Sequence, residues 1–543
     1  MRRSVIITSA AYVSSEIAAE VGNLPPAFLP LHSRRLFEHQ VALFPRRDHE
    51  IYLTVPEGFA LDRIDADKLR ELEVAVVSVP TGLSLAESLL YVMTTIGLFS
   101  GSVRVLHGDT LMRSLPVERE DMFIAGRTTS YYPWAEYQTD AAGVATFKDG
   151  LWRPKESLVV SGYFAFSDAA LLIRALATAR GHFIRALNIY SAGRGLRPEV
   201  TSNWYDLGHL QTYFASRARY PTARSFNQLR AGEHVITKRS ADADKISAEA
   251  AWFARLPGPL RRFTPQLLAS GRSAEGGAEY ELELLRLIPL SDLFVFGQLP
   301  QLVWSSIFDA CDDWLTECRK YPAPAALPGQ ASPSSQPTPI EQARQIYLPK
   351  TLRRLEDFAR KTDFPIDREL ALGDRPLPGL GTIAELAAQA IPAIDERDLC
   401  VIHGDFCFSN ILYDHRAGAV KLIDPRGGAD LHGDPRYDVA KLHHSVIGLY
   451  DFLLAGRYWL DAPDARHFTL AFPIEAPHRD VQGLFAERLF SNTVRGSDPA
   501  ILAISVLLFL AMLPLHEEAP ARQRAFVANA LRLFVELDRG SCP

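Results

Sequence analysis

Apolar runs of strand length alternate with stretches of helical length in the first part of the chain. The segment 85–98 has helical length, and four short runs are rich in valine, isoleucine and leucine: 5–8, 51–56, 74–80 and 103–106. Strands that alternate with helices favour a Rossmann-like α/β domain with a mainly parallel sheet. Ligands of such sheets bind beyond the carboxyl ends of the strands. Asp109, which follows the run at 103–106, is therefore a candidate site residue.

A different pattern occupies residues 400–428, CVIHGDFCFSNILYDHRAGAVKLIDPRGG. An apolar run delivers His403 and Asp405 into a loop, Asn410 precedes a short strand, and a second strand returns the chain to Asp424. We expect a hairpin that brings the side chains of Asp405, Asn410 and Asp424 together. One carboxylate of such a set accepts the proton of an attacking hydroxyl, while the other carboxylate and the amide oxygen hold magnesium.

This stretch resembles the catalytic hairpin of the aminoglycoside phosphotransferase and choline kinase family, small-molecule relatives of the protein kinases. The resemblance implies an α+β bilobal kinase-like fold with ATP as phosphoryl donor. It also implies that Asp405 is the catalytic base and that Asn410 and Asp424 are magnesium ligands. His403 is then a structural residue of the loop.

Flanking segments extend the kinase resemblance. Residues 234–258 predict a strand, a polar turn and an amphipathic helix, with Lys238 at the end of the strand and Glu249 on the helix. In kinase-like N-lobes a strand lysine reaches the nucleotide phosphates and pairs with a helix glutamate, which assigns nucleotide binding to these two residues. Downstream, Asp438 starts another helix, and it either caps that helix or braces the catalytic loop.

Three segments of the first part resemble sugar-nucleotidyltransferases: LPPAFLPLHSRRLFEHQ at 24–40, VSGYFAF at 160–166 and NWYDLG at 203–208. The resemblance implies that Asp109 and Asp206 bind the catalytic magnesium. Gly162 is expected to let the backbone approach a substrate, as a glycine in a strand often does.

The first part also departs from that family. Where the family has a glycine-rich loop with an arginine, this chain has Ser9–Ser15, with neither residue type, and Pro26 replaces a lysine. Glycine amides cradle phosphates, and a positive side chain stabilises departing pyrophosphate. Two interpretations stay open: the nucleotide is held differently, or the domain has kept its fold and lost its chemistry.

Length and composition limit the remaining classes. A chain of 543 residues is too long for one core. Its net charge of -6 does not indicate binding to nucleic acid or to an acidic membrane surface. Its five cysteines form no C-x-x-C pair, so we expect reduced thiols and a cytoplasmic protein without a disulfide framework or a zinc site. The apolar run 501–515 is too short to span a bilayer, and predicts a buried helix capped by Ser497 or Asp498.

We therefore predict two domains, a nucleotidyltransferase-like domain over 1–225 and a kinase-like domain over 226–543. The kinase-like domain has an N-lobe at about 226–295 and a helical C-lobe at about 296–543, interrupted by a flexible Pro/Ser-rich insert at 322–339. The predicted reaction is ATP-dependent phosphorylation of a hydroxyl on a sugar, polyol or amino alcohol. Nucleotidyl transfer onto the product would follow, with Mg²⁺ and CTP or another nucleoside triphosphate, to make an activated donor for capsule or lipopolysaccharide.

Three alternatives remain. The chain is a single small-molecule kinase if its first domain is degenerate. An antibiotic-modifying kinase would have an acidic pocket for a polycation. A protein kinase is disfavoured because Asp424 is followed by P-R-G in place of F-G, and no A-P-E follows. The identity of the acceptor, the choice of triphosphate and the oligomeric state are not fixed by the sequence.

Overall fold

The computed structural model describes residues 3–541 apart from 129, 131, 151–156, 221–227, 233, 241, 273–276, 325–337 and 427–430. The chain divides into two compact units. Unit 1 comprises Met1–Thr222 with Phe296–Gln298, and unit 2 comprises Ala223–Val295 with Leu299–Pro543. Most of the predicted insert at 322–339 lies outside the described residues.

A seven-stranded sheet in the order β10-β6-β9-β4-β1-β2-β3 forms the centre of unit 1. Its strands are β1 (Arg3–Thr8), β2 (His49–Pro56), β3 (Val74–Val79), β4 (Val103–His107), β6 (Met122–Thr128), β9 (Ser157–Phe166) and β10 (Arg197–Thr201). Strand β9 runs antiparallel to β4 and β6, while the other neighbouring pairs are parallel. The predicted mainly parallel α/β sheet is confirmed.

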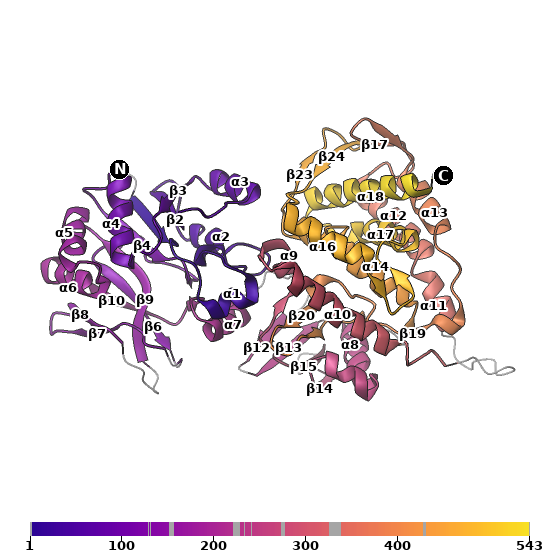
Figure 1. Cartoon of the computed structure of the whole chain (residues 1–543), viewed down its shortest axis with the longest axis horizontal. Helices are drawn as coiled ribbons and strands as arrows, with labels where there is room; N and C mark the ends of the chain where they lie inside the picture. The colour runs from indigo at the N-terminus through magenta and orange to yellow at the C-terminus, as the bar shows by residue number, and fades with distance from the viewer. Residues whose placement is uncertain are drawn as a thin grey trace. The chain divides into compact units, whose positions relative to one another are not determined.

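Helices cover both faces of this sheet (Figure 1). Because side chains alternate along a strand, Ile6 of β1 packs into one core while Val5 and Ile7 pack into the other. The first core is shared with α4 (Leu85–Thr95), α5 (Ala169–Ala179) and α6 (Phe183–Arg194), and the second with α2 (Leu36–Val41) and α3 (Arg63–Glu71). The remaining elements of unit 1 are α1 (Ser15–Val21), α7 (Leu210–Arg219) and the strand pairs β5 (Thr110–Met112) with β11 (Trp204–Asp206) and β7 (Glu136–Thr139) with β8 (Ala145–Lys148).

Unit 2 begins with a four-stranded antiparallel sheet in the order β12-β13-β15-β14, against which α8 packs. These elements are β12 (Gln228–Ala231), β13 (Val235–Ser240), β14 (Leu267–Arg272), β15 (Ala278–Glu283) and α8 (Ala243–Arg255). Helix α8 begins where the Asp242 side chain accepts a hydrogen bond from the Lys245 amide, which satisfies one of the free donors of the first turn. A second, three-stranded sheet pairs β16 (Ile288–Pro289) with the hairpin β20 (Ile411–Asp414) and β21 (Ala419–Leu422).

The rest of unit 2 is mainly helical (Figure 1). Its helices are α9 (Leu290–Phe296), α10 (Gln301–Cys318), α11 (Pro339–Gln345), α12 (Leu348–Thr362), α13 (Leu380–Gln389), α14 (Pro435–Val446), α15 (Tyr450–Leu454), α16 (Ala476–Glu487), α17 (Pro499–Met512) and α18 (Pro520–Ser541). Its short strands are β17 (Leu370–Leu372), β18 (Arg375–Leu377), β19 (Cys400–Val401), β22 (His432–Gly433), β23 (Trp459–Asp461), β24 (His467–Ala471), β25 (Leu489–Phe490) and β26 (Val494–Arg495).

Helix α17 lies at the centre of this helical part. It is apolar all round, and α12, α13, α14 and α18 pack against it. The Asp498 side chain accepts a hydrogen bond from the Ala500 amide at 2.8 Å, and Pro499 occupies the first turn, as predicted. Among the described helices, the stretch Pro499–His516 is long and apolar enough to cross a membrane by length and composition. The prediction that the run 501–515 is too short to span a bilayer is therefore wrong, because the helical stretch extends beyond that run at both ends. Inside unit 2, 67% of this stretch is buried.

His444 on α14 provides a test of this core. Its ring is fully buried between Tyr450 and Phe509, whose centroids lie at 4.4 and 4.1 Å, and neither ring nitrogen has a hydrogen-bond partner in the described structure. Burial lowers the pKa of His444 well below its usual value. Below about pH 6.5, His444 therefore binds a proton in the unfolded chain but not in the folded chain. The free energy of unfolding consequently decreases as the pH falls.

We expect His444→Phe to remove this loss of stability. Urea unfolding at pH 7.5 and 5.5 should show the variant gaining about 1.4 kcal/mol relative to wild type at the lower pH. An identical pH dependence of both proteins would contradict the prediction.

Candidate active sites

The loop between β19 and β20 carries Asp405 and Asn410. The side-chain amide of Asn410 donates hydrogen bonds to the backbone carbonyl of Asp405 at 3.0 Å and to its carboxylate Oδ2 at 2.8 Å. The Ile423 amide donates to the Asn410 carbonyl at 3.0 Å, so the hairpin returns Asp424 beside Asn410. The structure thus gathers the three residues that the sequence pattern singled out.

Hydrogen bonds from a helix fix the shape of this loop. The carboxylate of Asp438 on α14 accepts from the His403 and Gly404 amides at 2.7 and 2.8 Å, while Asp434 caps the helix. Of the two roles that the sequence left open for Asp438, this geometry corresponds to the bracing one. Burial raises the pKa of Asp438 to about 7, against the lowering effect of those two amides.

His403 ties the loop to the returning strand. Its Nε2 donates to the Ile423 carbonyl at 3.1 Å, and its Nδ1 accepts from the Asp405 amide at 3.2 Å. Burial lowers the pKa of His403 to about 4, so the ring is neutral at physiological pH. A neutral ring with both nitrogens engaged in backbone hydrogen bonds holds geometry and has no free nitrogen for proton transfer.

Three distant segments meet at Lys238 of β13. Its Nζ lies 2.6 Å from Oε2 of Glu249 on α8 and 3.0 Å from Oδ1 of Asp424. The Tyr280 hydroxyl donates to the same Glu249 oxygen at 2.8 Å. Asp424 has a φ of 53°, a left-handed conformation that is uncommon outside glycine. This cluster places the ammonium group of Lys238 at the end of the hairpin, where nucleotide phosphates and their magnesium would lie.

Sequence analysis missed Lys441 of α14. Its Nζ lies 2.8 Å from Oδ1 of Asp405. Burial alone would raise the pKa of Asp405, but the charge and hydrogen bond of Lys441 hold it below its usual value. A usable signal was present, because Asp438 and Lys441 are three residues apart and therefore share one face of the helix.

Asp109 and Asp206 form the candidate site of unit 1. Strands β5 and β11 pair antiparallel with Asp206 opposite Thr110, the residue after Asp109, and the Leu207 amide donates to the Asp109 carbonyl at 2.8 Å. Burial and the negative charge of Asp109 raise the pKa of Asp206 to about 8. Two neighbouring carboxylates fit a magnesium ion that takes its other ligands from substrate phosphates and water. Among the described residues, no group of three or more His, Cys, Asp or Glu side chains could hold a metal.

A cavity of about 300 Å³ adjoins Asp109. It is lined by the loop 9–14, which follows β1, and by Asp109 and Gly208, among others. Its position beyond the strand ends is where α/β sheets bind ligands. No lysine or arginine occurs among the described residues that line it.

Gly162 has a structural reason to be glycine. It is buried in β9 with a φ of 92°, and a Cβ there would lie 2.8 Å from Oγ1 of Thr110 and 2.9 Å from Nδ1 of His107. The residue therefore allows β9 to pack closely beneath the segment that carries Asp109. Its contact with a substrate stays a prediction.

The fold and the residues around Asp405 define unit 2 as a kinase-like phosphotransferase domain. Residues 228–465 match the family model described as "Phosphotransferase enzyme family". The match confirms the predicted kinase-like domain and supports the prediction of a phosphotransferase enzyme. Comparison with curated proteins finds no match.

Solved structures of sugar pyrophosphorylases and a cytidylyltransferase resemble the N-terminal part of the chain. A nucleoside-diphosphate-sugar pyrophosphorylase from Vibrio cholerae RC9 is 16% identical with a TM-score of 0.33, and the match covers 39% of this chain and 99% of that chain. The CTP:phosphocholine cytidylyltransferase of Streptococcus pneumoniae is 14% identical with a TM-score of 0.32, covering 40% and 98%. Similarity at this level assigns no activity to unit 1.

The buried ion pair of Lys238 and Glu249 can be tested by a double-mutant cycle. Lys238→Met leaves Glu249 unpaired in the interior, and we expect the free energy of unfolding to fall by about 3 kcal/mol. Glu249→Gln should also destabilise the protein, and the double variant should lose less than the sum of the two. Urea unfolding measures all four proteins, and additive losses would contradict the pairing.

Proposed function

We propose that unit 2 transfers the γ-phosphoryl group of ATP to a hydroxyl group of a small molecule. The observation that carries the proposal is the meeting of Lys238, Glu249 and Asp424 within 3.0 Å contacts, on the hairpin that also bears Asp405 and Asn410. Lys238 binds the phosphates, and Glu249 keeps the lysine in place. Asn410 and Asp424 would hold a magnesium ion, which when bound neutralises charge on the phosphates.

Asp405 faces the acceptor. Phosphoryl transfer passes through a loose transition state, in which the attacking oxygen keeps its proton until late. A carboxylate with a lowered pKa suits this step because it stays ionised, orients the hydroxyl and receives the proton as the new bond forms. Asn410 and Lys441 hold the two carboxylate oxygens in position, at 2.8 Å each.

We also propose that unit 1 couples the phosphorylated product to a nucleoside triphosphate, CTP or another. The phosphate of the product would attack the α-phosphorus of the nucleotide and release pyrophosphate, with Asp109 and Asp206 holding magnesium. The result is an activated donor of the kind used for capsule or lipopolysaccharide. The adjacent carboxylates and the cavity at the strand ends support this assignment.

A second candidate function is a kinase whose unit 1 has kept its fold and lost its chemistry. The cavity lining favours it, because without lysine or arginine among its described residues the leaving pyrophosphate lacks a positive partner.

Phosphorus NMR tests both assignments. The full chain is incubated with ATP, magnesium and a panel of small alcohols and sugars, and CTP, UTP and GTP are then added in turn. A phosphomonoester that is absent with Asp405→Asn would establish the kinase. A diphosphodiester that is absent with Asp109→Asn would establish nucleotidyl transfer, whereas a phosphomonoester alone would favour the second candidate. Absence of even slow ATP hydrolysis would contradict the kinase.

A further inference from the structure

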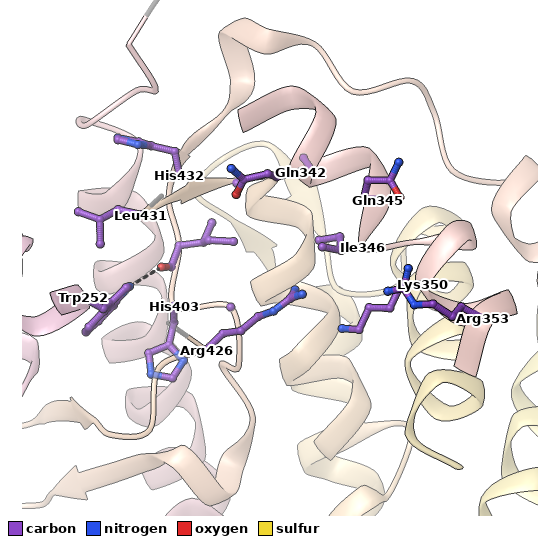
Figure 2. A pocket seen from close by; sticks show the side chains of 14 residues that line it. Trp252, Gln342, Gln345, Ile346, Lys350, Arg353, His403, Arg426, Leu431 and His432 are labelled. Atoms are coloured by element: carbon purple, nitrogen blue, oxygen red, sulfur yellow. Dashed lines mark hydrogen bonds between the residues drawn. The ribbon is translucent and has the colours of Figure 1, made fainter. Parts of the chain in front are cut away.

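A second cavity of about 300 Å³ lies in unit 2 (Figure 2). It borders the catalytic loop, the loop between β19 and β20 that carries Asp405 and Asn410. Fourteen residues line it, from α8, α11, α12, the catalytic loop and the segment around β22. His403 and Gly404, which lead directly into Asp405, form part of its wall, and Trp252 closes another side by donating from Nε1 to the Ile402 carbonyl at 3.1 Å. This volume is that of a small ligand.

Positive charge gathers in this cavity, which we call the cationic cavity. Lys350 and Arg353 enter it from α12, and Arg426 enters it from the segment after β21. Figure 2 shows the Lys350 and Arg426 side chains extending toward each other. The structure gives none of these three side chains an ion pair, and no acidic residue lines the cavity, within the part of the chain that is described.

Positive side chains that line one cavity favour the binding of an anion there. Burial, followed by the charges of Arg426, Arg354 and Lys441, lowers the pKa of Lys350 to about 6, and Asp405 opposes this effect. An anion in the cavity would relieve that repulsion and favour the charged lysine. Arg353 and Arg426 are exposed, so such an anion could enter from solvent and meet the planar guanidinium groups that bind carboxylates and phosphates through paired hydrogen bonds.

The nucleotide does not account for this charge. Lys238, Glu249, Asn410 and Asp424, which would bind ATP and magnesium, do not line the cavity. The cavity instead borders the residues that lead into Asp405, whose carboxylate faces the acceptor. Its charge also opposes a polycationic acceptor, and the acidic pocket expected of an antibiotic-modifying kinase is not what this cavity presents.

We propose that the acceptor of the kinase reaction carries an anionic group, a carboxylate or a phosphate ester, in addition to its hydroxyl. Lys350, Arg353 and Arg426 bind the anionic group and thereby set the hydroxyl against Asp405. The reaction remains that proposed for unit 2, on which this inference rests: the hydroxyl oxygen bonds to the γ-phosphorus, the bond to the bridging oxygen breaks, ADP leaves, and Asp405 takes the proton.

Matched acceptors test the proposal by kinetics. The members of each set share one carbon skeleton and differ in charge. One set is glycerol, glycerate and glycerol phosphate, and the other is glucose, gluconate and glucose 6-phosphate. Choline serves as the cationic acceptor. ADP release should give a higher kcat/KM for anionic members than for neutral ones. Lys350→Gln and Arg426→Gln should reduce that ratio at least tenfold. Arg360→Gln, an exposed residue of the same helix that pairs with Asp357, is the matched control and should leave the ratio unchanged.

Calorimetry separates this inference from the kinase assignment. Inorganic phosphate and malonate are titrated into the full chain with magnesium and a non-hydrolysable ATP analogue, whose own binding shows that each variant is folded. Both cavity variants should weaken anion binding at least tenfold, and the stronger of the two probes distinguishes a phosphate ester from a carboxylate. Turnover that prefers neutral or cationic acceptors, or anion binding that is equal in wild type and variants, would overturn the proposal. Anion binding with neither turnover of any acceptor nor slow ATP hydrolysis would overturn the kinase function, and the acceptor assignment with it.

Discussion

Asp405→Asn is expected to lower kcat for phosphoryl transfer by about 1,000-fold, with little change in the KM for ATP. The amide has the shape of the carboxylate but only one acceptor oxygen, so either Lys441 or Asn410 loses its partner at this position, and the amide cannot receive the proton of the acceptor. Lys238, with its contacts to Glu249 and Asp424, is untouched by this substitution. A coupled assay of ADP release at saturating ATP measures both constants.

Asp414→Asn is the matched control for this variant. Asp414 belongs to the same hairpin, and its Oδ1 accepts from the Arg416 and Ala417 amides at the exposed turn, where an amide oxygen can do the same. We expect wild-type kinetics. If Asp405→Asn retained more than a tenth of the wild-type kcat, another group would have to be the base.

Lys441→Met is expected to lower kcat by about 100-fold. Its ammonium holds one oxygen of Asp405 at 2.8 Å, and without it the carboxylate loses both its orientation and the charge that keeps it ionised. Lys441→Arg keeps the charge with a different geometry and should recover part of the rate.

The same change in the Asp405→Asn protein distinguishes positioning from general damage. If Lys441 acts through Asp405, Lys441→Met should lower the residual rate of Asp405→Asn less than tenfold, because the group it positions is already lost. Equal losses in both backgrounds would show that Lys441 acts elsewhere. Steady-state rates of the four proteins measure this coupling.

Local patterns predicted the elements of the fold better than their order in space. The alternation of apolar runs and helical segments predicted a mainly parallel sheet, and the run at 501–515 predicted a buried helix. Nothing local showed that β9 inserts antiparallel between β4 and β6, because that pairing joins strands separated by dozens of residues. Strand order is set by the packing of whole faces, which no short window of sequence contains.

The residues of the candidate site likewise divide into those that a local pattern predicts and those that depend on the packing of distant elements. Asp405, Asn410 and Asp424 lie within one short stretch whose spacing reflects a single hairpin, so the sequence could group them. Lys441 and the cationic cavity depend on where α12 and α14 pack against that hairpin. A periodic pattern indicates that a helix has a polar face, yet it does not say what that face meets, and Lys350 in the basic segment YLPKTLRRLEDF has the pattern of any solvated lysine.

The position of α17 has a consequence for the nascent chain during translation. Helix α14, which supplies Asp438 and Lys441 to the catalytic loop, packs against α17, and Ser505 of α17 hydrogen-bonds to His443 of α14 at 2.8 Å. During translation the loop leaves the ribosome well before α17 and α18 exist. A polypeptide interrupted at that stage would contain every residue of the kinase chemistry without the support that shapes it. The enzyme should therefore acquire kinase activity only late in synthesis, once α17 has emerged and packed against α14.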